Sequence, residues 1–242
     1  MKVVITGASK GIGKALALKF ANDGHDLAIC SRNLTDLTLL KEQIHSIHPD
    51  LDVYVSVTDV SKKEEVLDFS NAVVKHFGSI DVLINNAGVF LPGKISEEQD
   101  GTLEKLIDTN LYSAYHLTRA LLPVIKKSEK PHIFNLCSVA SFMAYPNGGS
   151  YSISKFALLG FSKVLREELK SSGIKVTAVM PGATWSDSWS GAELPYERLM
   201  EAEDIAESIL SIYKLGPSAV VEEIILRPVS YTHLTLPTKL EV

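Results

Sequence analysis

Short apolar runs rich in β-branched residues alternate along this chain with longer segments of helical periodicity. The apolar runs lie at residues 2–6, 27–31, 52–56, 82–85, 132–136, 175–179 and 223–226. Their apolar content is nearly continuous, as expected of strands that are covered on both faces. The amphipathic segments between them lie at residues 12–22, 34–48, 62–77, 102–126, 151–171 and 202–214. This alternation predicts an α/β fold with a doubly wound, Rossmann-like parallel sheet of about seven strands and helices on both faces.

The organisation of the chain indicates one domain. Its 242 residues contain no linker and no internal boundary, so we predict a single domain over residues 1–228. Residues 229–242 differ in character from what precedes them, and we interpret them as a non-native tail, such as a cloning or sequencing artefact. Their alternating pattern could also form an edge strand.

Composition excludes several classes of partner. The formal net charge of -5 argues against a nucleic-acid or membrane surface. Cys30 and Cys137 both lie in apolar runs, and no metal-ligand spacing occurs, so we expect two buried, reduced thiols and no metal. No apolar run approaches the ~20 residues of a membrane span, and the N-terminus lacks a signal peptide. We therefore expect a cytoplasmic protein that acts on a small molecule.

The turn between the first predicted strand and the first predicted helix reads Thr-Gly-Ala-Ser-Lys-Gly-Ile-Gly over residues 6–13. Its glycine spacing differs from the G-x-G-x-x-G dinucleotide fingerprint. The glycines still permit a tight turn, and the free N–H groups of a helix start suit a phosphate. Some glycine turns only make room for packing. In this position we predict nucleotide binding by Gly7, Ser9, Lys10, Gly11, Ile12 and Gly13.

The residues after the second and third predicted strands indicate which nucleotide binds. An NAD-preferring site would place a carboxylate after the second strand, but this chain has Ser31 and Arg32 there. Together with Lys10, these residues favour a 2′-phosphate and hence NADP(H), unless Arg32 only faces solvent. Asp59, followed by Val60, is placed to accept a hydrogen bond from an adenine amino group, or to cap the following helix.

The stretch Tyr-Ser-Ile-Ser-Lys at residues 151–155 has two chemical interpretations. Ser152 and Lys155 form S-x-x-K, but the companion S-D-N and K-T-G motifs of that hydrolase class do not occur in the chain. Tyr151 and Lys155 share one helical face, where the ammonium would lower the phenol pKa toward that of a working acid–base. Ser138 ends the fifth predicted strand, where it can donate to a substrate carbonyl.

Taken in order, these features resemble the short-chain dehydrogenase/reductase family, over residues 1 to about 228. The motifs that carry the resemblance are the turn at residues 6–13, Asn-Asn-Ala-Gly at 85–88, Asn110, Ser138, Tyr151 with Lys155, and Pro181-Gly182. Residues 181–189 and 220–228 are similar to bacterial sepiapterin-reductase-like members. The resemblance implies an NAD(P)-dependent oxidoreductase.

The resemblance also implies roles for individual residues. Asn110, Ser138, Tyr151 and Lys155 form the catalytic proton relay, in which Asn110 holds a water that links Lys155 to solvent. The motif of Asn85, Asn86, Ala87 and Gly88 steadies the sheet and borders the cofactor, and the nicotinamide is bordered by Pro181, Gly182, Thr184 and Ser186. Ser186 stands where the family often has a threonine, so the hydroxyl is replaced in kind.

Two loops are candidates for the walls of a substrate site. Residues Trp185, Trp189, Leu194, Tyr196, Leu199 and Met200 are placed for a lid, or for ordinary loop packing. Residues 141–145, with Asn147, could line the opposite wall. We expect a ketone or aldehyde substrate, sepiapterin-like or a diketone. The alternatives are a 3-oxoacyl-thioester reductase, a non-catalytic NADPH-binding regulator, and a scaffold that uses only its oligomer surface.

The helical segments 102–126 and 151–171 carry more apolar residues than one stripe needs. These residues are Leu106, Leu111, Tyr115, Leu117 and Leu121 in the first segment, and Phe156, Leu158, Leu159, Phe161 and Leu165 in the second. A helix that lies on one sheet face needs only a single apolar stripe. The excess predicts a homodimer or homotetramer that pairs these helices.

Overall fold

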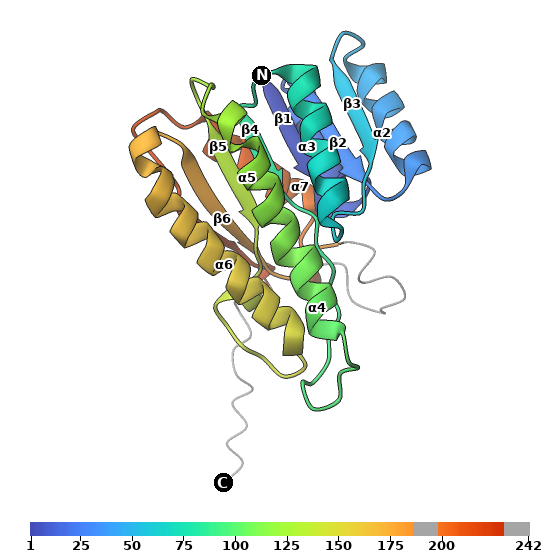
Figure 1. Ribbon diagram of the computed structural model, residues 1–242, viewed down its shortest axis with the longest axis vertical. Coiled ribbons are helices and arrows are strands. Elements are labelled where there is room, and N and C mark those ends of the chain that lie inside the picture. Colours follow the sequence, from blue (N-terminus) through green and yellow to red (C-terminus); the bar gives the residue numbers. More distant parts are fainter. Residues whose placement is uncertain (186–197, 230–242) are drawn as a thin grey trace.

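The computed structural model describes residues 1–185 and 198–229 (Figure 1). Its strands are β1 (Lys2–Thr6), β2 (Asp26–Ser31), β3 (Val53–Val57), β4 (Val82–Asn85), β5 (His132–Leu136), β6 (Lys175–Pro181) and β7 (Glu223–Leu226). They form a seven-stranded sheet in the order β3-β2-β1-β4-β5-β6-β7, in which every pair is parallel. The predicted α/β fold class is confirmed.

Helices cover both faces of this sheet. They are α1 (Gly11–Asn22), α2 (Leu34–Ile47), α3 (Lys63–Phe77), α4 (Thr102–Ile107), α5 (Ser113–Ile125), α6 (Gly149–Leu169) and α7 (Ala202–Lys214). Helices α3, α5 and α6 pack on one face, in front of the sheet in Figure 1, and α1, α2 and α7 pack on the other. Among the described residues, no helix is long and apolar enough to cross a membrane.

The strand sequences explain why both faces are covered. In β1, Val3 and Ile5 contact the core beneath α1 and α7, whereas Val4 contacts the core beneath α3 and α5. All three side chains are fully buried. Because successive strand residues point to opposite faces, a strand buried on both sides must be apolar at every position. The continuous apolar runs of the sequence are therefore the signature of this double core.

The largest departure from the predicted elements lies in the helix expected at 102–126. The structure divides it into α4, a π-helical turn at Asp108–Tyr112, and α5. A π turn accommodates an extra residue within a helix, and such turns are frequent at functional sites. Asn110 lies inside the π turn and is 1% exposed. Asn110 is therefore a buried side chain and not part of the helix surface.

The sheet order reverses direction beside β1, which lies between β2 and β4. Such a switch point leaves a crevice at the carboxyl ends of the strands. Hydrogen bonds join the two strand ends here: the Thr6 hydroxyl accepts from the backbone N–H groups of Asn86 and Ala87 at 3.1 and 3.0 Å. The Asn86 amide donates in return to the carbonyls of Thr6 and Gly7. This exchange fixes the floor of the crevice.

Most of the apolar residues that suggested a second buried face belong to the core of the single chain. Leu106, Leu117, Leu121, Leu158, Leu159 and Leu165 are all buried. That part of the sequence argument is wrong, because α4, α5 and α6 also pack against one another and need more than one stripe. A smaller exposed apolar set remains on these helices and the π turn, comprising Tyr112, Tyr115, Ile153, Phe156 and Val164.

Candidate active site

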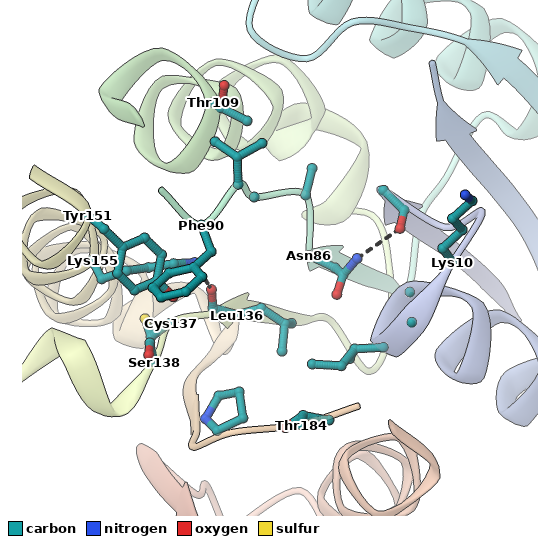
Figure 2. Close-up of a pocket in the computed structure, with 18 of the residues that line it drawn as sticks. Lys10, Asn86, Phe90, Thr109, Leu136, Cys137, Ser138, Tyr151, Lys155 and Thr184 are labelled. Carbon is teal, nitrogen blue, oxygen red and sulfur yellow. Dashed lines mark hydrogen bonds between the residues drawn. The ribbon is translucent and has the colours of Figure 1, made fainter. Parts of the chain in front are cut away.

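A cavity of about 1110 Å³ opens at the carboxyl ends of the strands. That volume exceeds the usual range of a small-ligand pocket, so it suits a dinucleotide together with a substrate. The predicted site residues that line it are Gly7, Ser9, Lys10, Gly11, Ile12, Gly13, Ser31, Arg32, Asp59, Val60, Asn86, Ala87, Gly88, Ser138, Tyr151, Lys155, Pro181, Gly182 and Thr184. Lys10 lies toward one end and the Tyr151–Lys155 pair toward the other (Figure 2).

Two glycines of the first turn lack the space for any side chain. Gly7 has a φ of +64°, and a Cβ added there would lie 2.9 Å from the Ala87 Cα. A Cβ added to Gly13 would lie 2.1 Å from the Gly7 carbonyl oxygen and 2.5 Å from the Asn86 amide nitrogen. The turn therefore folds back on the strand ends and presents bare backbone to the cavity at the start of α1. This arrangement suits the close approach of a pyrophosphate.

The end of the cavity at Lys10, Ser31 and Arg32 is the predicted adenosine site and is called the adenosine end below. It carries an acidic residue that the sequence did not lead us to expect. Ser31 is buried and Arg32 is exposed, and both line the cavity. The Lys10 ammonium lies 4.0 Å from the carboxylate of Asp36, which also lines the cavity. The N–H of Asp36 donates to the Asn33 side chain at 3.2 Å, which places it in the first turn of α2. The capping pattern of Asn33 followed by Asp36 was the available sequence signal.

Asp59 serves the turn before α3 rather than the helix itself. The N-cap of α3 is Lys62, whereas Asp59 Oδ1 accepts from the N–H and hydroxyl of Ser61 at 3.1 and 2.8 Å. Burial acts to raise the pKa of Asp59, but hydrogen bonds from Ser61 and the cation of Lys62 hold it below its ordinary value. The positive charge of Arg32 also lowers the pKa of Asp59. Asp59 is thus an ionised acceptor at the cavity wall.

Tyr151 lies in the first turn of α6, at the catalytic end of the cavity. Its ring packs edge-on against Phe90, with the ring centroids 4.8 Å apart, and Figure 2 shows the two rings together. Ser138 follows β5 and is held by a reciprocal cap, in which its N–H donates to the Ser141 hydroxyl and its own hydroxyl accepts from the Ala140 N–H. Ser138 is thereby held in place at the cavity wall, where its hydroxyl acts to lower the pKa of the Tyr151 phenol.

The pKa of Tyr151 moves opposite to the expected direction. Burial raises it to about 12, and hydrogen bonding with the Ser138 hydroxyl opposes that shift only in part. The expected lowering by Lys155 does not occur, because the Lys155 ammonium donates to the Leu136 carbonyl at 2.9 Å. Its nitrogen lies 5.9 Å from the centre of the Tyr151 ring. In this structure the phenol is a fully protonated donor.

Lys155 is 5% exposed, and burial lowers its pKa to about 8. A buried ammonium costs free energy unless a charge or strong acceptors compensate it. Here one backbone carbonyl, that of Leu136, is the hydrogen-bond partner found among the described residues. Its charge is therefore available to an electronegative group brought beside it.

Asn110 joins the helix of Tyr151 to the loop after β4. Its Oδ1 accepts from the Val89 N–H at 2.8 Å, and its Nδ2 donates to the Val89 carbonyl at 3.1 Å and the Ser154 hydroxyl at 2.9 Å. A Cβ added to Gly88 would lie 3.2 Å from Asn110 Oδ1 and 3.4 Å from the Lys155 nitrogen. The predicted neighbourhood of Asn110 and Lys155 is therefore present, while the water between them stays a prediction.

Asn85 does not line the cavity as expected. It is 4% exposed, and its Nδ2 donates to the Thr118 hydroxyl at 3.0 Å and to Asn135 Oδ1 at 2.8 Å. It therefore ties β4 to β5 and α5, which is the sheet-steadying half of its predicted role. Ser186 lies outside the described residues.

Glu98 is a residue that sequence reasoning missed. Its Oε1 accepts from the Ser150 N–H at 2.9 Å, and its Oε2 bonds the Ser150 hydroxyl. The Gly93 N–H also donates to the Asn147 carbonyl at 2.9 Å. The loop after β4 thereby holds the N-terminus of α6, where a carboxylate is favourable. No local pattern marked this contact, because the two segments are distant in sequence.

The predicted substrate walls are present in part. Met143 and Tyr145 line the cavity, whereas Ser141 is buried beneath Ser138. At the candidate lid, the Trp185 N–H donates to the Met200 carbonyl at 2.8 Å, which closes the base of that segment. Leu199 is buried. Trp189, Leu194 and Tyr196 lie outside the described residues.

The sequence as a whole matches a known protein family. The family model of short chain dehydrogenases matches residues 1–194. The chain belongs to the short-chain dehydrogenase family. This short-chain dehydrogenase is 33% identical over 236 residues to a sepiapterin reductase of Chlorobaculum tepidum, covering 94% of this chain and 96% of that protein.

Solved structures of other short-chain dehydrogenases superpose on this one. An alcohol dehydrogenase of the archaeon Thermococcus sibiricus, complexed with 5-hydroxy-NADP, has a TM-score of 0.87 and 30% identity, covering 94% of this chain and 96% of that chain. The closed form of a serine dehydrogenase, complexed with NADP+, has a TM-score of 0.87 and 26% identity, covering 95% and 96%. The predicted NADP(H) cofactor agrees with these complexes and with a family that binds NAD(P).

Proposed function

We propose that this short-chain dehydrogenase is an NADPH-dependent carbonyl reductase that converts a ketone or aldehyde into an alcohol. The observation that carries the proposal is that the Tyr151 phenol, Ser138 and Lys155 line one cavity together. The other end presents the backbone cradle formed by the glycine turn at residues 7–13, where a Cβ added to Gly7 or Gly13 would clash with neighbouring atoms. A proton donor and a dinucleotide site in one cavity are what such a reduction requires.

The residues present fit the cofactor. The bare backbone around Gly7 and Gly13 would receive the pyrophosphate, and Arg32 would pair with the 2′-phosphate. Pro181, Gly182 and Thr184 would border the nicotinamide. When bound, NADPH supplies the hydride that converts the carbonyl carbon into the alcohol carbon. Asp36 lies near the phosphate position, and its pairing with Lys10 offsets its repulsion of that group.

The side chains at the catalytic end handle the proton. Ser138 and Tyr151 hydrogen-bond the carbonyl oxygen, on which negative charge grows as the carbon receives its hydride. Tyr151 gives its proton to that oxygen and becomes a phenolate. The phenol has a pKa of about 12 and would not protonate the ground-state carbonyl oxygen. It donates its proton in the transition state, because the developing oxyanion is a stronger base than that carbonyl oxygen.

Lys155 would stabilise the phenolate in the catalytic complex. Its charge is retained below its pKa of about 8, and its ammonium would have to turn from the Leu136 carbonyl, which holds it in the cofactor-free structure, toward the phenolate. Lys155 would also bind the nicotinamide ribose. Asn110, which lies beside Lys155 across Gly88, would hold the water that returns the proton.

The substrate class that we favour is a ring ketone of the sepiapterin or diketone type. The support is the similarity to a sepiapterin reductase and the aromatic wall of Phe90 and Tyr145. A 3-oxoacyl thioester is the alternative substrate. A regulator that only binds NADPH is the alternative function, but it would have no use for a buried lysine beside a protonated phenol.

A turnover panel tests the proposal. Purified protein is mixed with NADPH and, in separate reactions, sepiapterin, a cyclic diketone, a 3-oxoacyl thioester and simple aldehydes, and the loss of NADPH is recorded. We expect oxidation with at least one ring ketone. Tight NADPH binding without turnover on the whole panel would instead support the regulator.

We also propose that the protein is a homodimer or homotetramer through α4, α5 and α6. The exposed apolar set of Tyr112, Tyr115, Ile153, Phe156 and Val164 supports this assembly. Light scattering on dilute protein should give a dimer or tetramer, and Phe156→Glu should shift it toward monomer. A wild-type monomer at micromolar concentration would contradict the proposal.

Two further expectations accompany this function. We propose that residues 1–228 form the reductase domain and that residues 229–242 take no part in it. We also propose a cytoplasmic setting, which suits the free, buried thiols of Cys30 and Cys137.

A further inference from the structure

Arg227 lies beside the predicted nicotinamide position. It follows β7 directly, where the Gly182 N–H donates to the Leu226 carbonyl at 2.7 Å. A Cβ added to Gly182 would lie 3.6 Å from the Arg227 Cα and 3.3 Å from the Pro228 Cδ. The backbone at Arg227 is thus packed against the Pro181–Gly182 segment, and its side chain starts at the catalytic end of the cavity.

The Arg227 side chain reaches across to the wall that carries Ser138. Its guanidinium carbon lies 5.8 Å from the centre of the Phe142 ring, and Phe142 ends the short turn that Ser138 caps. A ring face orients a guanidinium but cannot accept from all five of its N–H groups. Within residues 1–185 and 198–229, no carboxylate forms an ion pair with Arg227. The guanidinium of Arg227 therefore retains N–H groups that can donate to a ligand in the cavity.

Charge is distributed unevenly along the cavity. Among the described residues that line it, the acids are Asp36 and Asp59, and both lie at the adenosine end. The catalytic end is lined by the cations Lys105, Lys155 and Arg227, with no acid from the described part of the chain. A cavity end that carries one sign of charge raises the local concentration of ligands of the opposite sign.

We propose that the substrate carries a carboxylate on the same skeleton as its carbonyl, so that it is an oxo acid, cyclic or open-chain, and that Arg227 binds this carboxylate while the carbonyl lies at Tyr151. The planar fork of arginine matches a carboxylate in two parallel hydrogen bonds. Apolar residues that also line the catalytic end, Phe90, Leu91, Val139 and Met143, would contact the carbon skeleton between the two groups. This inference rests on the proposed carbonyl reduction and names the substrate class for the same site.

The experiment compares each oxo acid with its own methyl ester, which retains the carbonyl and loses the charge. A series of 2-oxo, 4-oxo and 5-oxo acids, some with aromatic rings, samples the separation between carbonyl and carboxylate. The variants are Arg227→Gln, which removes the charge, and Arg227→Lys, which keeps the charge without the fork. Lys105→Gln is the matched control, because it removes another cation of the same cavity end.

We expect the wild-type protein to prefer at least one acid over its ester. Arg227→Gln should lower kcat/KM for that acid by about 10- to 100-fold, mainly through KM, as expected for a lost charge-assisted hydrogen bond. The ester and the Kd of NADPH should be unaffected. Arg227→Lys should recover part of the loss, and Lys105→Gln should leave the acid-to-ester ratio as it is.

Several outcomes would overturn the inference while the proposed reductase stands. The wild type could reduce esters as well as acids, or Lys105→Gln could reproduce the effect expected of Arg227→Gln. A weaker NADPH Kd in Arg227→Gln, with equal losses on acid and ester, would assign Arg227 to the cofactor instead. Failure to reduce any member of either series or of the ketone panel would reject the proposed function itself.

Discussion

At the glycine turn of the cavity the ligand would meet mainly backbone, whereas at the catalytic end it would meet side chains. The glycine turn at residues 7–13 is defined by the absence of Cβ atoms. Tyr151, Ser138 and Lys155 come from two elements, and burial shifts the pKa values of the tyrosine and the lysine in opposite directions. The first end depends on shape, and the second depends on which groups hold protons. Substitutions at the first end should therefore impair cofactor binding, and substitutions at the second end should impair turnover.

The largest expected effect is at the catalytic end. Tyr151→Phe keeps the ring contact with Phe90 but removes the proton donor. We expect kcat to fall by at least the ~10² typical of general acid catalysis, while the Kd of NADPH changes little. Steady-state kinetics and cofactor titration give the two values. Turnover like that of the wild type would exclude Tyr151 from the mechanism.

The next effect concerns the adenosine end alone. Arg32→Asp replaces a cation at the proposed 2′-phosphate position with a carboxylate, and Asp36 is already nearby. The loss of a charge-assisted hydrogen bond should cut the preference for NADPH over NADH, measured as a ratio of kcat/KM, by about 10- to 100-fold. An unchanged ratio would mean that Arg32 only faces solvent. The kcat with saturating cofactor should stay near that of the wild type.

A smaller effect should follow from adding one methyl group to the cradle. Gly13→Ala places a Cβ 2.1 Å from the Gly7 carbonyl oxygen, which is backbone and must move. Overpacking of this kind costs about 1–3 kcal/mol of unfolding free energy, and NADPH binding should weaken as well. Gly160→Ala is the control, since nothing lies within 4 Å of its added Cβ. A helix interior favours alanine, so the control should be slightly more stable than the wild type.

The smallest net effect is expected at Lys155, and its sign depends on pH. Burial lowers its pKa from 10.5 in the unfolded chain to about 8. The ammonium therefore penalises folding below pH 8, by roughly 3 kcal/mol, and the penalty disappears as pH rises to 10.5. Lys155→Met should match or exceed the stability of the cofactor-free wild type at pH 7, because the unpaired Leu136 carbonyl offsets part of the gain.

Denaturant unfolding of both proteins at pH 7 and pH 10 measures this dependence. The advantage of Lys155→Met over the wild type should shrink as the pH rises. Lys126→Met, at an exposed position on the same face of the sheet, controls for the loss of any lysine. An advantage that grows with pH would contradict the lowered pKa.

Much of the fold could be predicted because double burial leaves a strong trace in the sequence. The runs in β1, β4 and β5 have the observed bounds, since a strand covered on both faces has to be apolar throughout. The π turn could not be predicted, because one extra residue within a helix of 24 positions barely alters its periodicity. Its reason lies in tertiary contacts, because the Asn110 side chain hydrogen-bonds Val89 and Ser154, which belong to other segments.

The candidate site also contains residues that the sequence could predict and residues that it could not. The cofactor-lining residues follow strand ends, whose positions the sequence pattern fixes. Phe90, Glu98 and Arg227 lie on segments whose path depends on tertiary contacts, so no spacing revealed them. The expected pKa direction of Tyr151 was wrong for a related reason: helical spacing brings Lys155 onto the correct face, but a carbonyl of the neighbouring strand, at Leu136, holds its ammonium.

The π turn at Asp108–Tyr112 has a consequence for how this chain can change in length. One residue of an α-helix corresponds to about 100° of rotation. Deleting any codon of this turn other than that of Asn110 would restore a regular helix and improve its local hydrogen bonding. It would also rotate α4, with its buried Leu106, relative to α5, and withdraw Asn110 from Ser154. A shorter gene would thus encode a better helix and a poorer enzyme, so alignments of working relatives should show no gap at these five positions.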